Sequence, residues 1–352
     1  WVGGITNPLT VIEQITYLMY SRMLDTMESK DEQKKALAGV DFKPRFQPHQ
    51  QDCRFSHYCN LGADEMMEVV RDEVFLHFRS LSNKEGDEGS LLGEFMKDAR
   101  LEIVKPNLLV KAVEMIKNLP LDRGDTKGDL YEYLLSKLTT AGINGQFRTP
   151  RHIIRAMVEM MEPNPARGER ICDPACGTGG FLSTSYEYLL EKYSSLDSIH
   201  TEAVTNEKGE LEQQKVFSGD LLSEYRQHVD FDMFHGYDFD STMLRIAAMN
   251  LIMHGVDEPD IHYQDTMSQS FSDKYPEASH NGFHLILANP PFTGTLDEED
   301  IDPDILKVVK NQKDRAAVLC PNPANAENWW SQRHSCASRC TLRFQQSPPE
   351  PA

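Results

Sequence analysis

The chain has no long apolar run and no cysteine framework. No segment approaches the ~20 consecutive apolar residues that cross a membrane, and none has the pattern of a signal peptide. The seven cysteines show no spacing typical of secreted disulfide pairs. These absences exclude a membrane-spanning protein and a disulfide scaffold, so we expect no membrane partner and a reducing, cytoplasmic location.

Positive charge is also scarce. Lys and Arg number 36 against 55 Asp and Glu, which gives a formal net charge of −19. Because phosphate neutralisation dominates nucleic-acid affinity, this balance argues against a protein that grips DNA unaided and favours a subunit that meets DNA with help. With 352 residues and 39% hydrophobic content, the chain is large enough for two packed domains.

A phosphate-binding loop of the Gly-x-x-x-x-Gly-Lys-Ser/Thr type is absent as well. The chain has instead a glycine-rich turn, Asp173 to Phe181, between a strand expected at Arg170–Cys172 and a helix expected at Leu182–Tyr193. Strand, glycine turn and helix in this order form the nucleotide crevice of a doubly wound α/β sheet. Since the turn holds no basic residue, a sulfonium ligand with an amino-acid tail fits it better than a phosphate. Taken alone, such a turn is weak evidence.

The motif Asn289-Pro290-Pro291-Phe292 follows the apolar run Phe283–Leu287. An exocyclic amine must be drawn toward tetrahedral geometry by acceptors for both of its N–H groups, and the Asn289 side chain and the Pro290 backbone carbonyl can supply them. The prolines hold these acceptors in place, and Phe292 offers a flat face to a flipped-out base. The motif therefore predicts adenine N6 methylation; a rigid strand exit is the alternative.

The two motifs in this order resemble the methylation (modification) subunit of type I restriction-modification systems, an S-adenosylmethionine-dependent adenine-N6 DNA methyltransferase. The similarity runs from Trp1 to about Lys313. It implies an α/β chain with an N-terminal all-helical domain and a Rossmann-like methyltransferase domain that is incomplete at its C-terminal end. The expected domains are 1–140 (helical), 141–313 (methyltransferase, partial) and 314–352 (aberrant tail).

The resemblance also implies a site. Gly145–Pro150 looks like the family's opening motif, which contacts the methionine portion of the donor; Thr149 could equally be a helix N-cap. Asp238, ending the second strand, would accept hydrogen bonds from ribose hydroxyls, and Asp265, following the strand-like Ile261–Tyr263, would touch the donor's adenine. A solvated strand end is the alternative for either acid. The implied cofactor-binding residues are Gln146, Phe147, Thr149, Asp173, Ala175, Gly177, Thr178, Gly179, Gly180, Asp238 and Asp265, and the implied catalytic residues are Asn289, Pro290, Pro291 and Phe292.

Methyl transfer from a sulfonium is an in-line displacement of a good neutral leaving group. It needs no metal, covalent nucleophile or strong general base. His334, Cys336 and Cys340 have loosely zinc-like spacing, but one Cys-x-x-x-Cys pair is a weak signal. We therefore expect no metal site.

Before residue 140 no segment alternates like a strand, so we expect an all-helical domain, which in the family contributes to subunit contacts and closure on DNA. A polar insertion is expected between Lys192 and Met233, because Asp238 lies further from the glycine turn than the usual ~20 residues. Apolar residues at helical spacing predict helices at Asn7–Met27, Ala63–Ser80, Gly89–Ala99, Asn107–Asn118 and Leu130–Leu138.

The tail departs from the family pattern. From Asp314 onward it has no clear helical period, where the family has an amphipathic helix, a Leu-Lys-x-Gly-Gly-Arg turn and a further core strand. A reading frame shifted by one nucleotide permits the missing element, so we hypothesise a frameshift near Asn311–Asp314; a disordered, Pro-rich native tail is the alternative. The sheet would keep its first four strands and lose those that close its other edge.

Three functions remain open at this point. The first is a DNA adenine methyltransferase subunit with S-adenosylmethionine as cofactor and DNA, a specificity subunit, a second methylation subunit and a restriction subunit as partners. The second is a catalytically silent remnant that binds at most its donor or its partner subunits. The third is an RNA or protein N-methyltransferase, since Asn-Pro-Pro-aromatic motifs also serve glutamine amides and guanine amines.

Overall fold

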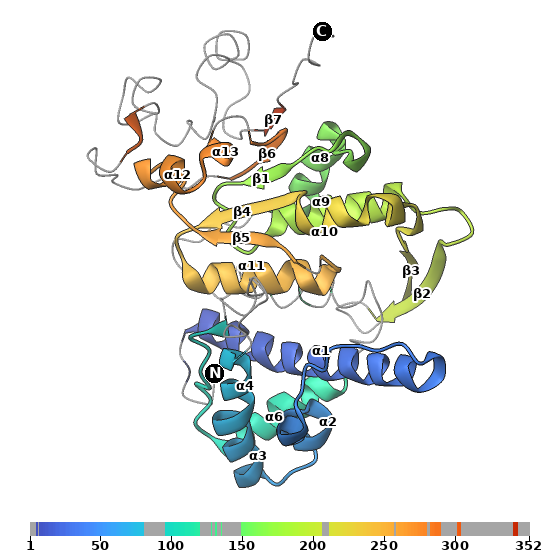
Figure 1. Ribbon diagram of the computed structural model, residues 1–352, viewed down its shortest axis with the longest axis vertical. Helices are drawn as coiled ribbons and strands as arrows, with labels where there is room; N and C mark the ends of the chain where they lie inside the picture. Colours follow the sequence, from blue (N-terminus) through green and yellow to red (C-terminus); the bar gives the residue numbers. More distant parts are fainter. Residues whose placement is uncertain are drawn as a thin grey trace. The chain divides into compact units, whose positions relative to one another are not determined.

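The computed structural model describes residues 5, 7–80, 96–119, 128, 131, 135, 149–205, 211–256, 258–279, 282–289, 301–303 and 341–343. The chain separates into two compact units, Trp1–Gln146 and Phe147–Ala352. The regular elements described in the first unit are all helices, and the second unit contains a β-sheet together with helices (Figure 1).

The helical unit is built on α1 (Pro8–Ala38). Asn7 caps its start by accepting a hydrogen bond from the Leu9 amide, and Gly39, with φ of 68°, ends it in the left-handed conformation. The helix runs eleven residues beyond the expected end at Met27. That extension carries no apolar period, but two of its acids are paired with a following segment: Arg45 bonds Asp31 at 2.8 Å and Arg54 bonds Glu32 at 2.8 Å.

Later segments of this unit contact the middle of α1 through Tyr58, Phe78 and the Ile116 carbonyl. The helix expected at Ala63–Ser80 forms, with a π-helical turn in its middle. In the core, the rings of Tyr17 and Phe75 meet edge to face, with 5.4 Å between their centroids. Of the segment expected as helix at Gly89–Ala99, residues 89–95 lie outside the described residues, and of Leu130–Leu138 only Tyr131 and Leu135 are described. The elements are η1 (Pro48–Cys53), α2 (Phe55–Tyr58), α3 (Ala63–Val69), η2 (Val70–Val74), α4 (Phe75–Ser80) and α6 (Pro106–Lys117).

The second unit contains a sheet with strand order β5-β4-β1-β6-β7. The first four of these pair in parallel, as expected for a doubly wound sheet, and each lies within one or two residues of its expected position. The strands are β1 (Ile171–Asp173), β4 (Phe234–Asp238), β5 (Asp260–Tyr263), β6 (Leu285–Leu287) and β7 (Thr341–Arg343).

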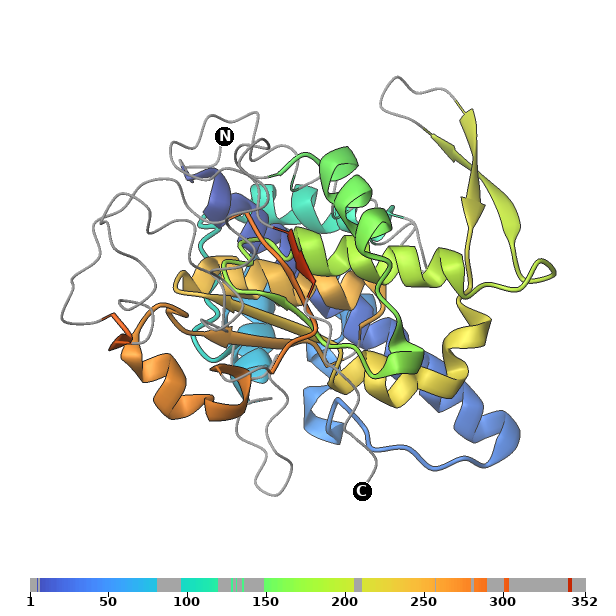
Figure 2. The same cartoon turned by 90° about the horizontal axis from the view of Figure 1, so that it is seen from above.

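Helices cover both faces of this sheet (Figures 1 and 2). On one face lie α9 (Gly180–Lys192) and α11 (Ser241–His254), and Tyr186 of α9 meets Phe234 of β4 at 6.0 Å between ring centroids. On the other lie α12 (Gln269–Lys274) and α13 (Pro276–Ser279), where Phe271 meets Tyr237 at 5.1 Å. Phe234 and Tyr237 point to opposite faces because side chains alternate along a strand.

The polar insertion expected between Lys192 and Met233 is folded. It forms an antiparallel ribbon of β2 (His200–Thr205) and β3 (Leu211–Val216), followed by η5 (Asp220–Tyr225) and α10 (Arg226–Phe231). Figure 2 shows the ribbon projecting from the body of the sheet.

The edge of the sheet beyond β6 is not bare. The short β7 from the tail pairs antiparallel with β6, matching Leu287 to Thr341. The expectation that the tail adds no strand there is therefore wrong in this respect, although the added strand runs antiparallel to the rest. Pairing of the exposed β6 backbone groups is the physical reason for such an addition.

Candidate functional site

The glycine turn leaves the carboxyl end of β1 and enters α9. Gly177 and Gly179 adopt φ of 53° and 74°, the left-handed conformation that glycine takes up without strain. A Cβ added to Gly177 would meet nothing within 4 Å, whereas one added to Gly179 would lie 3.3 Å from the Ala247 Cβ. Gly177 therefore borders open space and Gly179 faces packed protein.

The turn is held to the end of β4. The Cys176 amide donates to the Tyr237 carbonyl at 2.9 Å, and the Gly177 amide donates to Asp238 Oδ2 at 2.8 Å. Asp238 Oδ1 accepts a second hydrogen bond, from the Asp240 amide at 3.0 Å. A carboxylate has about four lone-pair sites, so Asp238 can anchor the turn and still accept a ligand hydroxyl.

Two carboxyl groups lie at neighbouring strand ends. Asp173 is 1% exposed, accepts a hydrogen bond from the Ala175 amide at 3.2 Å, and has a pKa raised to about 8 by burial and, secondarily, by the charge of Asp238. Burial also raises the pKa of Asp238, against the hydrogen bonds from Asp240 and Gly177 that favour its charged form. A cationic ligand would stabilise both charged forms, so the pair suits a sulfonium or ammonium group.

The segment after β5 completes this edge. Asp265 is partly buried and accepts a hydrogen bond from the Met267 amide at 2.9 Å. The hydroxyl of Thr266 donates to the Pro174 carbonyl at 3.2 Å, which ties this segment to the glycine turn. Asp265 therefore lies in the same cluster of strand ends as Asp173 and Asp238.

Asn289 reaches the same edge from the other side of β1. β6 pairs parallel with β1, matching Cys172 to Ile286, so the chain leaves both strands at one edge of the sheet. Asn289 is partly exposed there. Pro290, Pro291 and Phe292 lie outside the described residues, as do Gln146 and Phe147.

Thr149 is buried just before α8 (Arg151–Met161), with 8% of its surface exposed. Its reading as the N-cap of that helix is wrong: Pro150 occupies the cap position, no side chain caps the helix, and the Pro150 carbonyl accepts from the Ile153 and Ile154 amides. α8 nevertheless reaches the glycine turn, because Ile154 lies 3.4 Å from the Cβ position of Gly180.

Two aromatic side chains at this edge escaped the sequence analysis. Phe239, directly after Asp238, is 66% exposed, and Tyr263, which ends β5, is 63% exposed. Asp238 pairs with Tyr263 in the sheet register, so both rings belong to adjacent strand ends. The signal was present in the sequence, since Phe239 directly follows Asp238 and Tyr263 lies two residues before Asp265. Their flat faces could border a purine.

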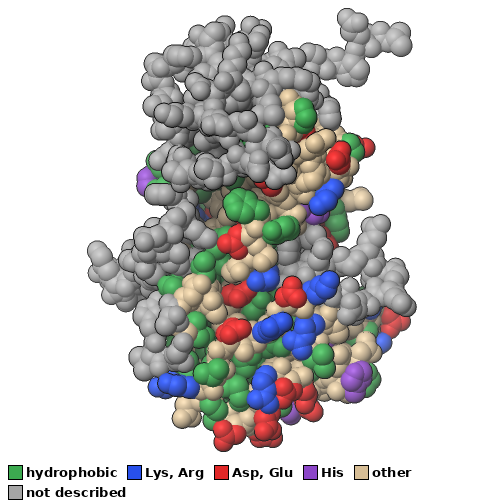
Figure 3. Space-filling model, turned by 90° about the vertical axis from the view of Figure 1, so that its left-hand side faces the viewer, with side chains coloured by type: hydrophobic (Ala, Val, Ile, Leu, Met, Phe, Trp, Pro, Cys, Tyr) green, Lys and Arg blue, Asp and Glu red, His purple; other side chains and the backbone are tan. Residues whose placement is uncertain are grey.

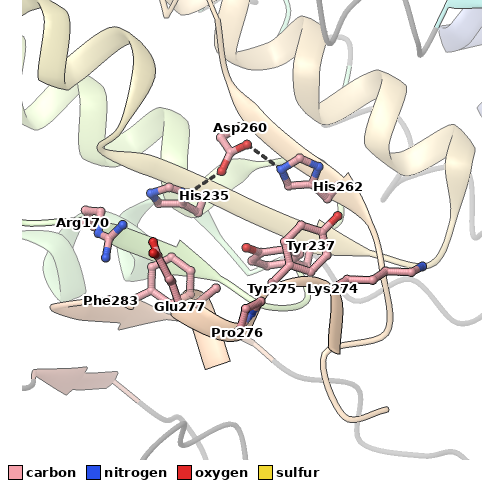
Figure 4. A pocket seen from close by; sticks show the side chains of 11 residues that line it. Arg170, His235, Tyr237, Asp260, His262, Lys274, Tyr275, Pro276, Glu277 and Phe283 are labelled. Atoms are coloured by element: carbon pink, nitrogen blue, oxygen red, sulfur yellow. Dashed lines mark hydrogen bonds and ion pairs between the residues drawn. The ribbon is translucent and has the colours of Figure 1, made fainter. Parts of the chain in front are cut away.

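Away from these strand ends, a hollow lies on the α12–α13 face of the sheet (Figure 4). It has a volume of about 360 Å³, and Asp260 joins two histidines there: His235 Nδ1 lies 2.5 Å from Asp260 Oδ2 and His262 Nε2 lies 2.5 Å from Oδ1. The second ring nitrogen of His235 faces the Asp232 carbonyl at 2.9 Å. Since both nitrogens of His235 are engaged, this trio is a structural brace between β4 and β5 rather than a set of metal ligands.

Among the residues that the structure describes, no group of three or more His, Cys, Asp or Glu side chains could hold a metal ion. The segment with His334, Cys336 and Cys340 lies outside them. No helix in the described part of the chain has both the length and the apolar character to cross a membrane.

Comparison with known families gives two matches that follow one another along the chain. Residues 3–116 match the HsdM N-terminal domain, and residues 122–334 match the N-6 DNA Methylase family. The resemblance inferred from the motifs is confirmed, and so is the fold class of a helical unit followed by a methyltransferase-like α/β unit.

The curated relatives carry matching descriptions. The type I restriction enzyme EcoEI methylase subunit of Escherichia coli is 23% identical over 342 residues, covering 91% of this chain and 62% of the relative. The type I restriction enzyme MjaIX methylase subunit of Methanocaldococcus jannaschii is 29% identical over 210 residues, covering 58% of this chain and 29% of the relative. The chain thus spans less than two thirds of the length of either relative.

Solved structures share the fold. A modification subunit from Vibrio vulnificus YJ016, provisionally assigned to a type I restriction enzyme, superposes with a TM-score of 0.63 at 24% identity, covering 86% of this chain and 60% of that one. The type I restriction-modification methyltransferase subunit from Streptococcus thermophilus superposes with a TM-score of 0.51 at 15% identity, covering 82% and 59%.

Proposed function

The chain belongs to the N-6 DNA Methylase family, whose match spans more than half of its length, and on that premise we propose that it transfers a methyl group from S-adenosylmethionine to N6 of adenine in DNA. One observation carries the proposal. The parallel pairing of β1 with β6 brings the glycine turn and Asn289 to one edge of the sheet from positions more than a hundred residues apart.

The residues on the β4 and β5 side fit the proposed donor. Gly177 leaves open space beside its backbone, Asp238 offers carboxylate lone pairs for hydroxyls, and Asp173 lies in the same cluster. Phe239 and Tyr263 supply exposed rings where a purine would lie. When bound, S-adenosylmethionine supplies an electrophilic methyl group on a positively charged sulfur.

Asn289 would act on the acceptor. Its side-chain carbonyl would accept one N–H of the adenine amine, and the Pro290 carbonyl is proposed to accept the other, so that the nitrogen lone pair points at the methyl group. Phe292 is proposed to stack on the base. Since the amine of a paired adenine is inaccessible inside the duplex, the nucleotide would have to be flipped out.

Other subunits would provide most of the binding affinity for DNA. The net charge is −19, and Figure 3 shows basic and acidic side chains intermixed over the described part of one face, without a continuous basic stripe. We therefore propose a specificity subunit and a second methylation subunit as partners, with a restriction subunit as a further one. The EcoEI and MjaIX relatives are themselves described as subunits.

Methyl transfer from radiolabelled S-adenosylmethionine to duplex DNA, RNA and protein tests the proposal. The assay would use the full chain together with a cognate specificity subunit. We expect label only in DNA, as N6-methyladenine, and none with Asn289→Ala, which should still bind the donor. Label in RNA or protein would reassign the acceptor. Donor binding without transfer to any acceptor would favour the silent remnant.

A further inference from the structure

Two residues of α11 contact the glycine turn. Ala247 and Asn250 lie three residues apart and so share one face of the helix. The Ala247 Cβ lies 3.3 Å from the Cβ position of Gly179, and Asn250 Nδ2 donates to the Thr178 carbonyl at 2.9 Å. The helix thus combines a close steric contact with a hydrogen bond to the adjacent peptide.

Asn250 is a polar residue in an apolar setting. It is 0% exposed, and its flanking residues on α11, Met249 and Leu251, are fully buried as well. Its amide also lies 3.3 Å from the Ser183 hydroxyl in the first turn of α9. Burial of an amide side chain is costly unless it is hydrogen-bonded, so these bonds to the turn account for its presence here.

Both ends of one peptide unit are fixed by this arrangement. The Thr178 carbonyl accepts from Asn250, and the amide of the same peptide, that of Gly179, donates to the Cys176 carbonyl at 2.8 Å. Because a peptide unit is planar, fixing its carbonyl and its amide prevents rotation of the whole plane. Loss of the Asn250 bond would leave the carbonyl without that partner and free the plane to turn.

We propose that Asn250 is a positioning residue: through the Thr178 carbonyl it holds the glycine turn in the conformation that receives the methyl donor. The inference rests on the proposed function of the turn. Asn250 lies outside the glycine turn and the Asn-Pro-Pro-Phe motif, and its amide donates to the Thr178 carbonyl and the Ser183 hydroxyl. Its effect should therefore fall on donor affinity rather than on the chemical step.

The test compares Asn250→Leu, which keeps the branched side-chain shape but cannot donate, with Ser185→Ala. Ser185 is equally buried, but its hydroxyl donates to the Phe181 carbonyl of its own helix. Titration of the full-length chain with S-adenosylmethionine should give a Kd raised about tenfold or more in Asn250→Leu, as expected for loss of a bond to a buried acceptor. Ser185→Ala should match the wild type. In the reconstituted methylation assay, Asn250→Leu should raise the KM for the donor and retain kcat.

Hydrogen exchange provides a second measurement that needs no donor. We expect faster exchange of the Gly177–Gly180 amides in Asn250→Leu and unchanged exchange in the α9 interior. An unchanged Kd together with unchanged turn exchange in a folded variant overturns the inference. If Asn250→Leu does not fold, Asn250→Ser, whose shorter side chain cannot reach Thr178, is measured in the same way, and a wild-type Kd for that variant also overturns it. If the wild-type chain binds no donor, the proposed function fails, whereas the exchange measurement still decides whether Asn250 holds the turn.

Discussion

The Gly177 amide donates a hydrogen bond to Asp238 Oδ2 at 2.8 Å, which joins the turn after β1 to the end of β4. One carboxylate therefore has two tasks: it fixes the glycine turn, and it is the proposed acceptor for the donor's hydroxyls. Substitution of Asp238 should therefore affect both the turn and the donor.

Asp238→Ala should abolish measurable donor binding. It removes both the anchor for Gly177 and the acceptor for hydroxyls, and each charged hydrogen bond contributes about 1.5–3 kcal/mol. Asp238→Asn keeps one acceptor oxygen and should bind with an intermediate Kd. Calorimetric titration with S-adenosylmethionine measures both, with circular dichroism to verify folding. Wild-type affinity in folded Asp238→Ala would remove this residue from the site.

The two glycines of the turn should respond differently to alanine. At Gly179 a methyl group meets Ala247 at 3.3 Å in a backbone with φ of 74°, so Gly179→Ala should lower the free energy of unfolding by about 1–3 kcal/mol. At Gly177 there is open space, so Gly177→Ala should lower the free energy of unfolding by only about 1 kcal/mol. Its main effect should be weaker donor binding, because the methyl group occupies that space. Urea unfolding and donor titration distinguish the two effects. Gly62→Ala is the control, since its Cβ would meet nothing within 4 Å and its φ of −65° suits any residue.

Asp173 should make the fold less stable as pH rises. Its folded pKa of about 8 lies above the ordinary 3.8 because burial disfavours the charge, so the native state holds a proton that the unfolded chain releases. Stability is then fully present below about pH 4 and declines as pH rises toward 8, by at most about 1.4 kcal/mol per pH unit. Asp173→Asn should flatten this decline.

Urea midpoints at pH 6 and pH 8.5, for wild type and Asp173→Asn, measure the effect. Saturating S-adenosylmethionine should also reduce the pH dependence of the wild type, because a cation beside Asp173 favours the ionised carboxyl. Identical pH profiles for the two proteins would show that Asp173 carries no raised pKa.

Glu187 of α9 should have the opposite effect on the pH dependence of stability. Burial alone would raise its pKa, but the hydrogen bond and charge of His254, together with Arg151, bring the pKa down from 4.5 to about 2. The stability that this group contributes is present above about pH 4.5 and is lost as pH falls toward 2. Thermal melting between pH 7 and pH 3 should therefore show a steeper loss for the wild type than for Glu187→Gln. Glu224→Gln, at an exposed glutamate of η5, serves as the charge-matched control.

Much of the sheet was predictable from the sequence. The strands expected at Arg170–Cys172, Ile261–Tyr263 and the apolar run Phe283–Leu287 form where the sequence placed them. Short segments of this kind between turn residues are typical of buried strands in a parallel sheet. The glycine-rich turn between β1 and α9 likewise lies where the sequence predicted it. Membership of the methyltransferase family followed from the order of the two motifs.

Other features depend on long-range packing. The second half of α1 has no apolar period and is held by Arg45 and Arg54, which lie beyond its end, so periodicity alone stopped the helix too early. Asn250 stands inside a hydrophobic helix, and its bond to Thr178 appears only when α11 is packed on the turn. The full burial of Asp173 likewise depends on the strands on either side of it. The domain bounds of 1–140, 141–313 and 314–352 remain predictions, as do the frameshift and the roles of Pro290, Pro291 and Phe292.

The parallel pairing of β1 with β6 also implies an order in which the strands of the sheet can assemble. β1, β4 and β5 are all synthesised before β6, so the glycine turn and Asp238 can meet while Asn289 is still being translated. β6 must then find a partner strand more than a hundred residues back in the chain, a non-local step of the kind that slows folding. A nascent chain would on this account acquire its donor half first, and a bound donor could stabilise that half while the acceptor strand docks.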